Sequence, residues 1–325
     1  YRGAIMNKIK FFTSVFACGF LLCCTAENST SNIKVVNWNV QTFFDATTEG
    51  TEYSDFISQK YWGVRSYETR LDRLCEVMKE LNADIFVFEE IENYDVVHDI
   101  ANRLANYSWA QRKNWNYTVF SKNDGDSIGC AVFSRYAISS VTVHNLDIRT
   151  EKTAQPKMRS IMQMKIHIDG KWLTVFVNHW KSKSGGAEKS EVWRDWQERL
   201  LASLMTKSVE GGEYVFASGD FNRDINEFTI DNPACYENVL LDDTLSLHSP
   251  WLFVTGELSF PGSYYYQGEW SRIDHFFVSS NVLLLDFTAE CGTWSNNDST
   301  PWRYTIYNGT GYSDHLPISA RLSFK

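Results

Sequence analysis

The chain has 325 residues, 43% of them hydrophobic and 22% charged, a composition that excludes a wholly disordered protein. Its 31 basic and 40 acidic residues give a formal net charge of -9, so there is no overall positive field with which to hold nucleic acid. A phosphate-bearing substrate would therefore need a local site or a bound metal.

The first residues predict export. Lys8 and Lys10 follow Met6 and precede an uncharged run over residues 11–26, which is shorter than the roughly 20 residues that span a membrane. A basic start, a short apolar stretch and a polar segment after it are typical of an export signal. Residues 1–5 would then lie upstream of the start.

The cysteines of this segment indicate a lipid anchor. The segment resembles a bacterial lipoprotein signal, in which Cys24 is the preferred acceptor by position, whereas Cys18 better fits the small-residue rule. We therefore expect residues 1–24 to be an export segment, residues 25–32 a polar tether, and the protein to be bound to the cell envelope by its lipid. A cleaved signal without lipid is the alternative.

Residues 33–325 are expected to form a single domain, since no linker, repeat or low-complexity stretch interrupts them. Apolar residues at helical spacing predict one helix through Leu71 and Leu81. A second helix is predicted from Val192, Trp196, Leu200, Leu201 and Leu204. Cys75 and Cys130 fall within apolar patterns and should be buried thiols, while a Cys235–Cys291 disulfide is not favoured. Strands are predicted at 33–38, 84–88, 117–120, 129–133, 138–143, 160–168, 172–178, 214–218, 272–279 and 318–324.

So many strands with so few crossover helices indicate an α/β protein of two packed β-sheets flanked by helices, rather than one doubly wound sheet. Polar residues gather where the predicted strands stop, which is where strand ends present side chains to a cleft. These clusters are Asn37-Trp38-Asn39, Glu89-Glu90, Asn178-His179-Trp180-Lys181-Ser182, Gly219-Asp220-Phe221-Asn222, Ser271-Arg272-Ile273-Asp274-His275 and Ser313-Asp314-His315. Carboxylates and amides without Cys/His ligand spacing favour Mg²⁺, Mn²⁺ or Ca²⁺ over zinc.

The order of these clusters resembles the endonuclease/exonuclease/phosphatase superfamily over essentially residues 33–325. The superfamily includes pancreatic-type deoxyribonuclease, abasic-site endonucleases, sphingomyelinases and inositol polyphosphate phosphatases. The resemblance implies the four-layer α/β sandwich of deoxyribonuclease I. It also implies a metal site at Asn39, Glu90 and Asp314, with Mg²⁺ the expected ion. The family usually has Gln before that glutamate, whereas this chain has Glu89, which would either strengthen ion binding or point into solvent.

The resemblance also implies the catalytic residues. Asp220 and Asn222 would orient the attacking water and hold a phosphate oxygen, and His315 would act with Asp274 as its orienting partner. His179 matches a second histidine of the deoxyribonuclease-like and sphingomyelinase-like branches. Its acidic partner stays open, with Asp124 and Asp126 as candidates, and His275 is expected to be structural.

Positive charge for phosphate binding is expected first from Lys181 and then from Arg159, with Lys183 and Arg135 also close to strand ends. The aromatic residues 264–266 and Trp270 precede Asp274 closely and would stack on bases. We therefore expect a metal-dependent phosphodiesterase acting on DNA, with no protein partner implied. The alternatives are a sphingomyelinase-like phospholipase, for which residues 250–254 would be the lipid-facing loop, an inositol or sugar phosphate phosphatase, and a binding module without activity.

Overall fold

A computed structural model describes residues 32–58, 60–108, 114–148, 154–231, 236–253, 255 and 257–325. The predicted export segment, residues 25–31 of the predicted tether and Cys235 lie outside the described residues. In the described part of the chain, no helix combines the length and apolarity that crossing a membrane requires. Residues 31–325 form one compact unit.

The first sheet has the strand order β15-β16-β1-β2-β4-β3, and its two central strands β1 and β2 run parallel. Both of these strands are buried on both faces, as expected for strands covered by other layers. The strands are β1 (Ile33–Phe43), β2 (Ile85–Ile91), β3 (Tyr117–Ser121), β4 (Gly129–Ser134), β15 (Val282–Ala289) and β16 (Ile318–Phe324).

The second sheet has the order β5-β6-β7-β8-β14-β11-β10-β9, and its central strands β7 and β8 also run parallel. A separate hairpin joins β12 (Tyr264–Tyr266) to β13 (Glu269–Ser271). The strands of the second sheet are β5 (Ala137–His144), β6 (Ile161–Ile168), β7 (Lys171–His179), β8 (Tyr214–Asp220), β9 (Thr229–Ile230), β10 (Asn238–Leu241), β11 (Leu245–His248) and β14 (Asp274–Val278).

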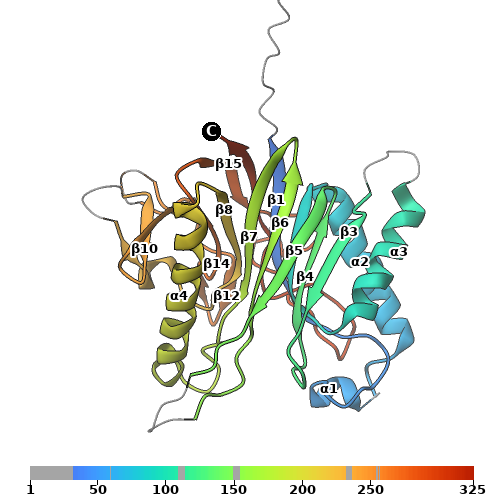
Figure 1. Cartoon of the computed structure of the whole chain (residues 1–325). Helices are drawn as coiled ribbons and strands as arrows, with labels where there is room; N and C mark the ends of the chain where they lie inside the picture. Colours follow the sequence, from blue (N-terminus) through green and yellow to red (C-terminus); the bar gives the residue numbers. More distant parts are fainter. Residues whose placement is uncertain are drawn as a thin grey trace, which may run out of the picture. The chain divides into compact units, whose positions relative to one another are not determined.

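Helices cover the outer faces of the two sheets (Figure 1). Helices α2 (Val64–Leu81) and α3 (Tyr94–Ser108) pack on the first sheet, and α4 (Ala187–Glu210) packs on the second. A short α1 (Ser54–Ile57) and a 3-10 turn (Ile225–Glu227) lie in the connections. Between the sheets, residues such as Val35, Val87, Val175, Phe216 and Ile318 form an apolar core. The predicted four-layer sandwich is confirmed.

Helix α4 is present where the sequence predicts a helix, and Leu201 of the predicted apolar face is fully buried, but the start of that face differs from the prediction. Val192 is 46% exposed, whereas Arg194 and Gln197 are 0% and 1% exposed. The difference arises because two buried arginines, Arg194 of α4 and Arg223 after β8, form ion pairs with Glu191 and Glu198 of α4, so polar side chains occupy this part of the inner face. An apolar periodicity cannot predict such a face. Helix α3, β15 and the strands β9 to β11 are further elements that the apolar patterns do not predict.

The topology brings the polar clusters to one edge of the sandwich. The carboxyl ends of β1 and β2 lie together because these strands are parallel, and the same holds for β7 and β8. Strand β14 runs antiparallel to β8, so its first residue, Asp274, pairs with Asp220, the last residue of β8. The segment before β16 returns to the same edge, because β16 is antiparallel to β1.

Candidate active site

The centre of the site joins the two sheets through one amide. The Asn39 Nδ2 atom donates to Glu90 Oε1 at 3.2 Å and to Asp220 Oδ2 at 3.0 Å. Asn39 and Glu90 come from the first sheet and Asp220 from the second, and Asn39 and Asp220 are almost fully buried. Two carboxylates therefore converge on one neutral group, an arrangement that suits a cation beside them.

His315 and Asp274 form a buried pair beside this centre. His315 Nδ1 lies 2.8 Å from Asp274 Oδ2, and the Ser263 hydroxyl donates to the same oxygen at 2.6 Å. His315 Nε2 is left facing Asp220 Oδ2 at 4.0 Å. Burial alone would lower the pKa of His315, but the carboxylates around it, Asp274 first, outweigh burial and raise the pKa to about 10. The predicted orientation of His315 by Asp274 agrees with this contact.

His179 stands on the other side of Asp220. Its Nε2 atom is 3.7 Å from Asp220 Oδ2 and 3.9 Å from Glu90 Oε1. Burial, followed by the charge of Arg159, holds the pKa of His179 well below its ordinary value, so the ring is neutral. Its acidic neighbours are thus Asp220 and Glu90, and not Asp124 or Asp126, the two candidates from the sequence.

The end of β8 is shaped by a close backbone approach. A Cβ on Gly219 would lie 1.9 Å from the Asn178 carbonyl oxygen, and the glycine φ is +151°. Only glycine fits there. The chain then turns at Asn222, which has a φ of 49°, donates its backbone N–H to Asp220 Oδ1 at 2.8 Å, and donates its side-chain amide to the Trp180 carbonyl at 3.2 Å. Asn222 therefore fixes one oxygen of Asp220 while the other faces the histidines.

Glu89 does not point into solvent. It is 0% exposed, and its Oε2 accepts a hydrogen bond from Asn37 Nδ2 at 3.2 Å. Burial and then the charges of Asp274 and Asp220 raise the pKa of Glu89 well above its ordinary value, which favours the protonated form of the side chain. A protonated glutamate is close to glutamine in shape and charge, which explains how the chain accommodates Glu at a position where the family usually has Gln.

The described residues contain one group of acidic and histidine side chains close enough to share an ion, namely Asp220, Asp274 and His315. Because Asp274 already bonds to His315, we interpret this group as a histidine–carboxylate pair beside Asp220. Asp314 lies near this group, is 18% exposed at its side chain and has Arg303 at 4.0 Å. Its role at the metal stays a prediction.

The four cations considered from the sequence lie in different places. Arg159 Nη1 donates to the Trp180 carbonyl at 3.1 Å, and Lys181 follows directly, so both border the site. Arg135 instead pairs with Asp84 at 3.1 Å, just before β2, and is therefore at the opposite end of the sheet. Lys183 pairs with Glu227 at 2.6 Å. The prediction that Arg135 supplies positive charge to the site is wrong, because Arg135 follows the end of β4 that lies away from the polar clusters.

Several residues that support the site give no signal in the sequence. Ser263 orients Asp274 from a loop, and Thr42 donates its backbone N–H to Glu90 Oε2 at 2.6 Å. Arg70 on α2 donates to three successive carbonyls at the end of β1. Tyr264 packs on His315 with ring centroids 4.7 Å apart, so the predicted aromatic segment does border the site.

Comparison with known proteins agrees with this geometry. The sequence model of the endonuclease/exonuclease/phosphatase family matches residues 34–291, and the chain belongs to this family. No curated protein sequence matches the chain. The match ends before Asp314 and His315, which the fold itself brings to Asp220.

Solved structures share the fold at low sequence identity. Truncated TDP2 from Caenorhabditis elegans is 16% identical with a TM-score of 0.59, over 90% of this chain and 98% of that one. The human Nocturnin catalytic domain with bound sulfate is 16% identical with a TM-score of 0.57, over 90% and 95%. TDP2 from D. rerio with a single-strand DNA product is 13% identical with a TM-score of 0.58, over 90% and 99%. The family membership makes the chain a phosphoesterase that hydrolyses phosphodiesters.

Proposed function

We propose that the protein is a divalent-metal-dependent phosphodiesterase that cleaves DNA as an endonuclease. The observation that carries the proposal is the position of Asp220 between a neutral and a charged histidine, with Glu90 held to it through Asn39. Such a site offers a proton acceptor and a proton donor on two sides of one phosphate.

Metal binding is assigned to Glu90, with Asn39 in support and Asp314 as a further carboxylate. The donor set fits a hard ion, because it consists of carboxylate and amide groups with no thiolate. Mg²⁺ is the expected ion, and Mn²⁺ or Ca²⁺ would suit the same donors. When bound, the ion would polarise the phosphate and offset the charge that develops on it.

Asp220 is assigned as the acceptor of the water proton. Burial raises its pKa to about 7, close to the working pH, while Asn222 and Asn39 fix the orientation of its oxygens. His315, kept charged by Asp274, would donate its Nε2 proton to a phosphate oxygen. His179, being neutral, would donate a second hydrogen bond without repelling the charged ring.

Nucleic acid is favoured over lipid by two observations. The D. rerio TDP2 structure, which shares the fold, holds a single-strand DNA product. In this chain the segment considered as a lipid-facing loop has Trp251 and Leu252 buried, which leaves Phe253 as its exposed apolar residue in the described part. One exposed ring is a weak membrane contact.

We also propose that the chain is exported and held at the bacterial cell envelope by a lipid on Cys24. The support is the basic start, short apolar run and cysteine cluster of residues 1–24.

The test is nicking of supercoiled plasmid by the purified protein. We expect activity with Mg²⁺ or Mn²⁺ and none with EDTA. Asp220→Asn and His315→Ala should each lower kcat by at least about 10²-fold, and Glu90→Gln should raise the Mg²⁺ concentration for half-maximal activity. Lys183→Gln, which alters an exposed ion pair, is the control. Untouched plasmid together with hydrolysis of sphingomyelin or an inositol phosphate would overturn the DNA assignment.

A further inference from the structure

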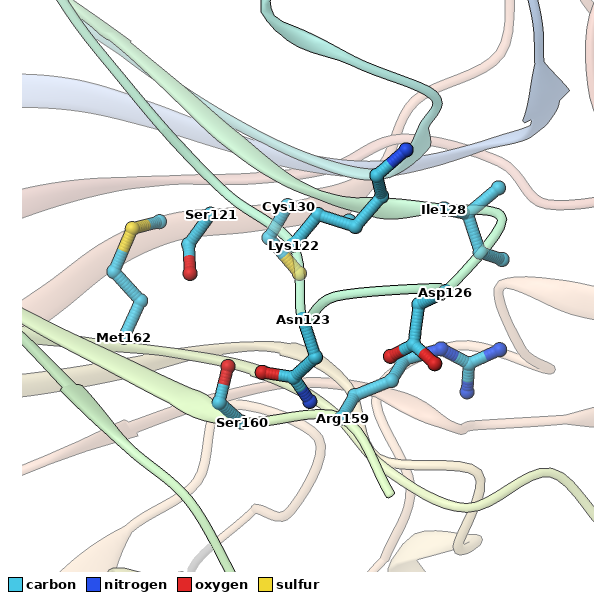
Figure 2. A pocket seen from close by; sticks show the side chains of 10 residues that line it. Ser121, Lys122, Asn123, Asp126, Ile128, Cys130, Arg159, Ser160 and Met162 are labelled. Carbon is cyan, nitrogen blue, oxygen red and sulfur yellow. The ribbon is translucent and has the colours of Figure 1, made fainter. Parts of the chain in front are cut away.

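A separate cavity of about 210 Å³ opens beside the catalytic centre. Three basic side chains line it, Lys157, Arg159 and Lys181, together with the half-exposed ring of Tyr53 and one acid, Asp126. Figure 2 shows Asp126 and Arg159 side by side in the narrow space that adjoins this cavity. The cavity therefore has an excess of positive charge in a chain that is acidic as a whole.

The three cations make no ion pair with a carboxylate among the described residues. Lys157 Nζ donates to the Gly125 carbonyl at 2.6 Å, and Arg159 Nη1 donates to the Trp180 carbonyl at 3.1 Å. Burial and then the charge of Arg159 lower the pKa of Lys181, which shows that two like charges are held close together. Placing like charges together is unfavourable unless an anion binds between them.

Helix α4 fixes two of these residues through one buried side chain. Gln197, 1% exposed, accepts the Lys181 backbone N–H at 2.8 Å and donates to the Arg159 carbonyl at 3.4 Å. Arg194, 0% exposed, donates to the Lys181 carbonyl at 3.1 Å. The backbone positions of both cations are thus held before any ligand arrives, which lowers the entropic cost of binding.

Hydrogen bonds link residues of the cavity to residues of the catalytic centre. The Trp180 carbonyl accepts from Arg159 and from the Asn222 side chain, which orients Asp220. Tyr53 lies near Glu90 of the catalytic centre. Burial is the main cause that raises the pKa of Tyr53, and the charge of Glu90 is the second. A substrate whose phosphate lies at Asp220 would therefore extend into this cavity.

We propose that the cavity binds a second phosphate of the same substrate, the phosphate next to the one that is cleaved, with the nucleoside between them against Tyr53. The inference rests on the proposed function and names its substrate class, a nucleic-acid strand with consecutive phosphates. A phosphocholine headgroup, which ends in a cation, would be repelled. An adjacent phosphate would instead gain charge-assisted hydrogen bonds from Lys157, Arg159 and Lys181.

The test compares p-nitrophenyl esters that differ by one phosphate. Thymidine 5′-(p-nitrophenyl phosphate) has a single phosphodiester, and its 3′-phosphorylated form has the same leaving group with a second phosphate. Thymidine 3′-(p-nitrophenyl phosphate), with and without a 5′-phosphate, covers the other strand direction. With Mg²⁺ present, we expect the added phosphate to lower KM about tenfold in one direction. Lys157→Gln should reduce this advantage about threefold or more, whereas Lys183→Gln, outside the cavity, should keep it.

Binding of thymidine 3′,5′-bisphosphate by calorimetry gives a readout that does not depend on turnover. Weaker binding to Lys157→Gln than to Lys183→Gln supports the site even if no ester is hydrolysed, in which case only the proposed function fails. Hydrolysis of the single esters with no gain from the added phosphate in either direction overturns the site and leaves the proposed function standing. Tighter binding of inositol 1,4-bisphosphate than of the nucleotide would overturn the substrate class.

Discussion

The adjacent residues Glu89 and Glu90 have carboxyl groups in different environments. The pairing of β2 with β4 shifts register between Glu89 and Ile91, and Glu90 adopts a φ of 68°. Because of this bulge, Glu90 turns toward Asn39 and solvent while Glu89 stays in the space between the sheets. The two carboxyl groups thus differ in environment: burial favours the protonated form of Glu89, whereas Glu90 is available to an ion.

His275 provides a test of stability against pH. It is 0% exposed, its Nε2 lies 2.8 Å from the Arg223 carbonyl, and burial lowers its pKa to about 4. In the unfolded chain the pKa would be about 6.5, so the unfolded state binds a proton first as pH falls. The neutral His275 ring therefore contributes about 3 kcal/mol to the free energy of unfolding. This contribution is fully present above pH 6.5 and is lost as the pH falls from there toward 4.

We therefore predict that His275→Gln weakens the acid dependence of folding. Urea unfolding at pH 7 and pH 4.5 should show a smaller difference in the free energy of unfolding for the variant than for the wild type. The same substitution at the exposed His167 controls for the general effect of replacing a histidine. An unchanged difference in His275→Gln would show that His275 is charged in the folded protein.

At the scale of elements, the end of β1 is an irregular segment that α2 holds in place. Gln41 and Thr42 both have positive φ, of 52° and 47°, which is unfavourable for residues other than glycine. Arg70 donates to the carbonyls of Val40 and Thr42 at 2.8 and 2.9 Å and also to that of Gln41. The N–H groups of this segment in turn hold Asn39 and Glu90, so α2 positions the predicted metal site.

We predict that Arg70→Lys disturbs metal binding, because lysine keeps the charge but cannot reach three carbonyls as a planar fork. Unsatisfied buried carbonyls should cost about 1–3 kcal/mol of stability. The Mg²⁺ concentration for half-maximal activity should rise several-fold, with kcat at saturating Mg²⁺ changed less. Arg73→Lys is the matched control, since Arg73 donates to Gly309 and Gly311 from the next turn of the same helix. Equal Mg²⁺ dependence in both variants would remove the positioning role.

For the molecule as a whole, the net charge and the proposed lipid anchor would govern how the protein meets its substrate. Loss of residues 1–23 would take away Arg2, Lys8 and Lys10 and no acid, which leaves a more acidic catalytic domain. Such a domain has few fixed cations for DNA, so a bound ion and the cationic cavity would provide the local attraction, and little sequence preference is expected.

We predict that Cys24→Ala releases the protein from the membrane fraction without changing turnover, because the polar stretch from Thr25 to Asn32 separates the signal from the catalytic domain. Cell fractionation and labelling with a radioactive fatty acid measure this. Cys23→Ala is the control and should stay labelled. Continued labelling of Cys24→Ala would move the anchor to Cys18 or Cys23.

The sequence alone determined the class of the protein, because strand-end clusters such as Gly219-Asp220-Phe221-Asn222 are local and keep their order along the chain. It also predicted most strands of both sheets, since alternating or continuous apolar runs depend on neighbours in the sequence. It did not predict that Arg194 and Gln197 are buried on the inner face of α4 beside the predicted Leu201.

Only the tertiary structure decided what surrounds each site residue. Asn39 meets Asp220 across 181 residues, and His315 meets Asp274 across 41. The pairing of Glu89 with Asn37, the hold of Arg70 on β1, and the gathering of Lys157, Arg159 and Lys181 likewise depend on contacts between distant segments. Burial and electrostatic fields arise from such contacts, so protonation states and binding cavities exist only once the two sheets have packed.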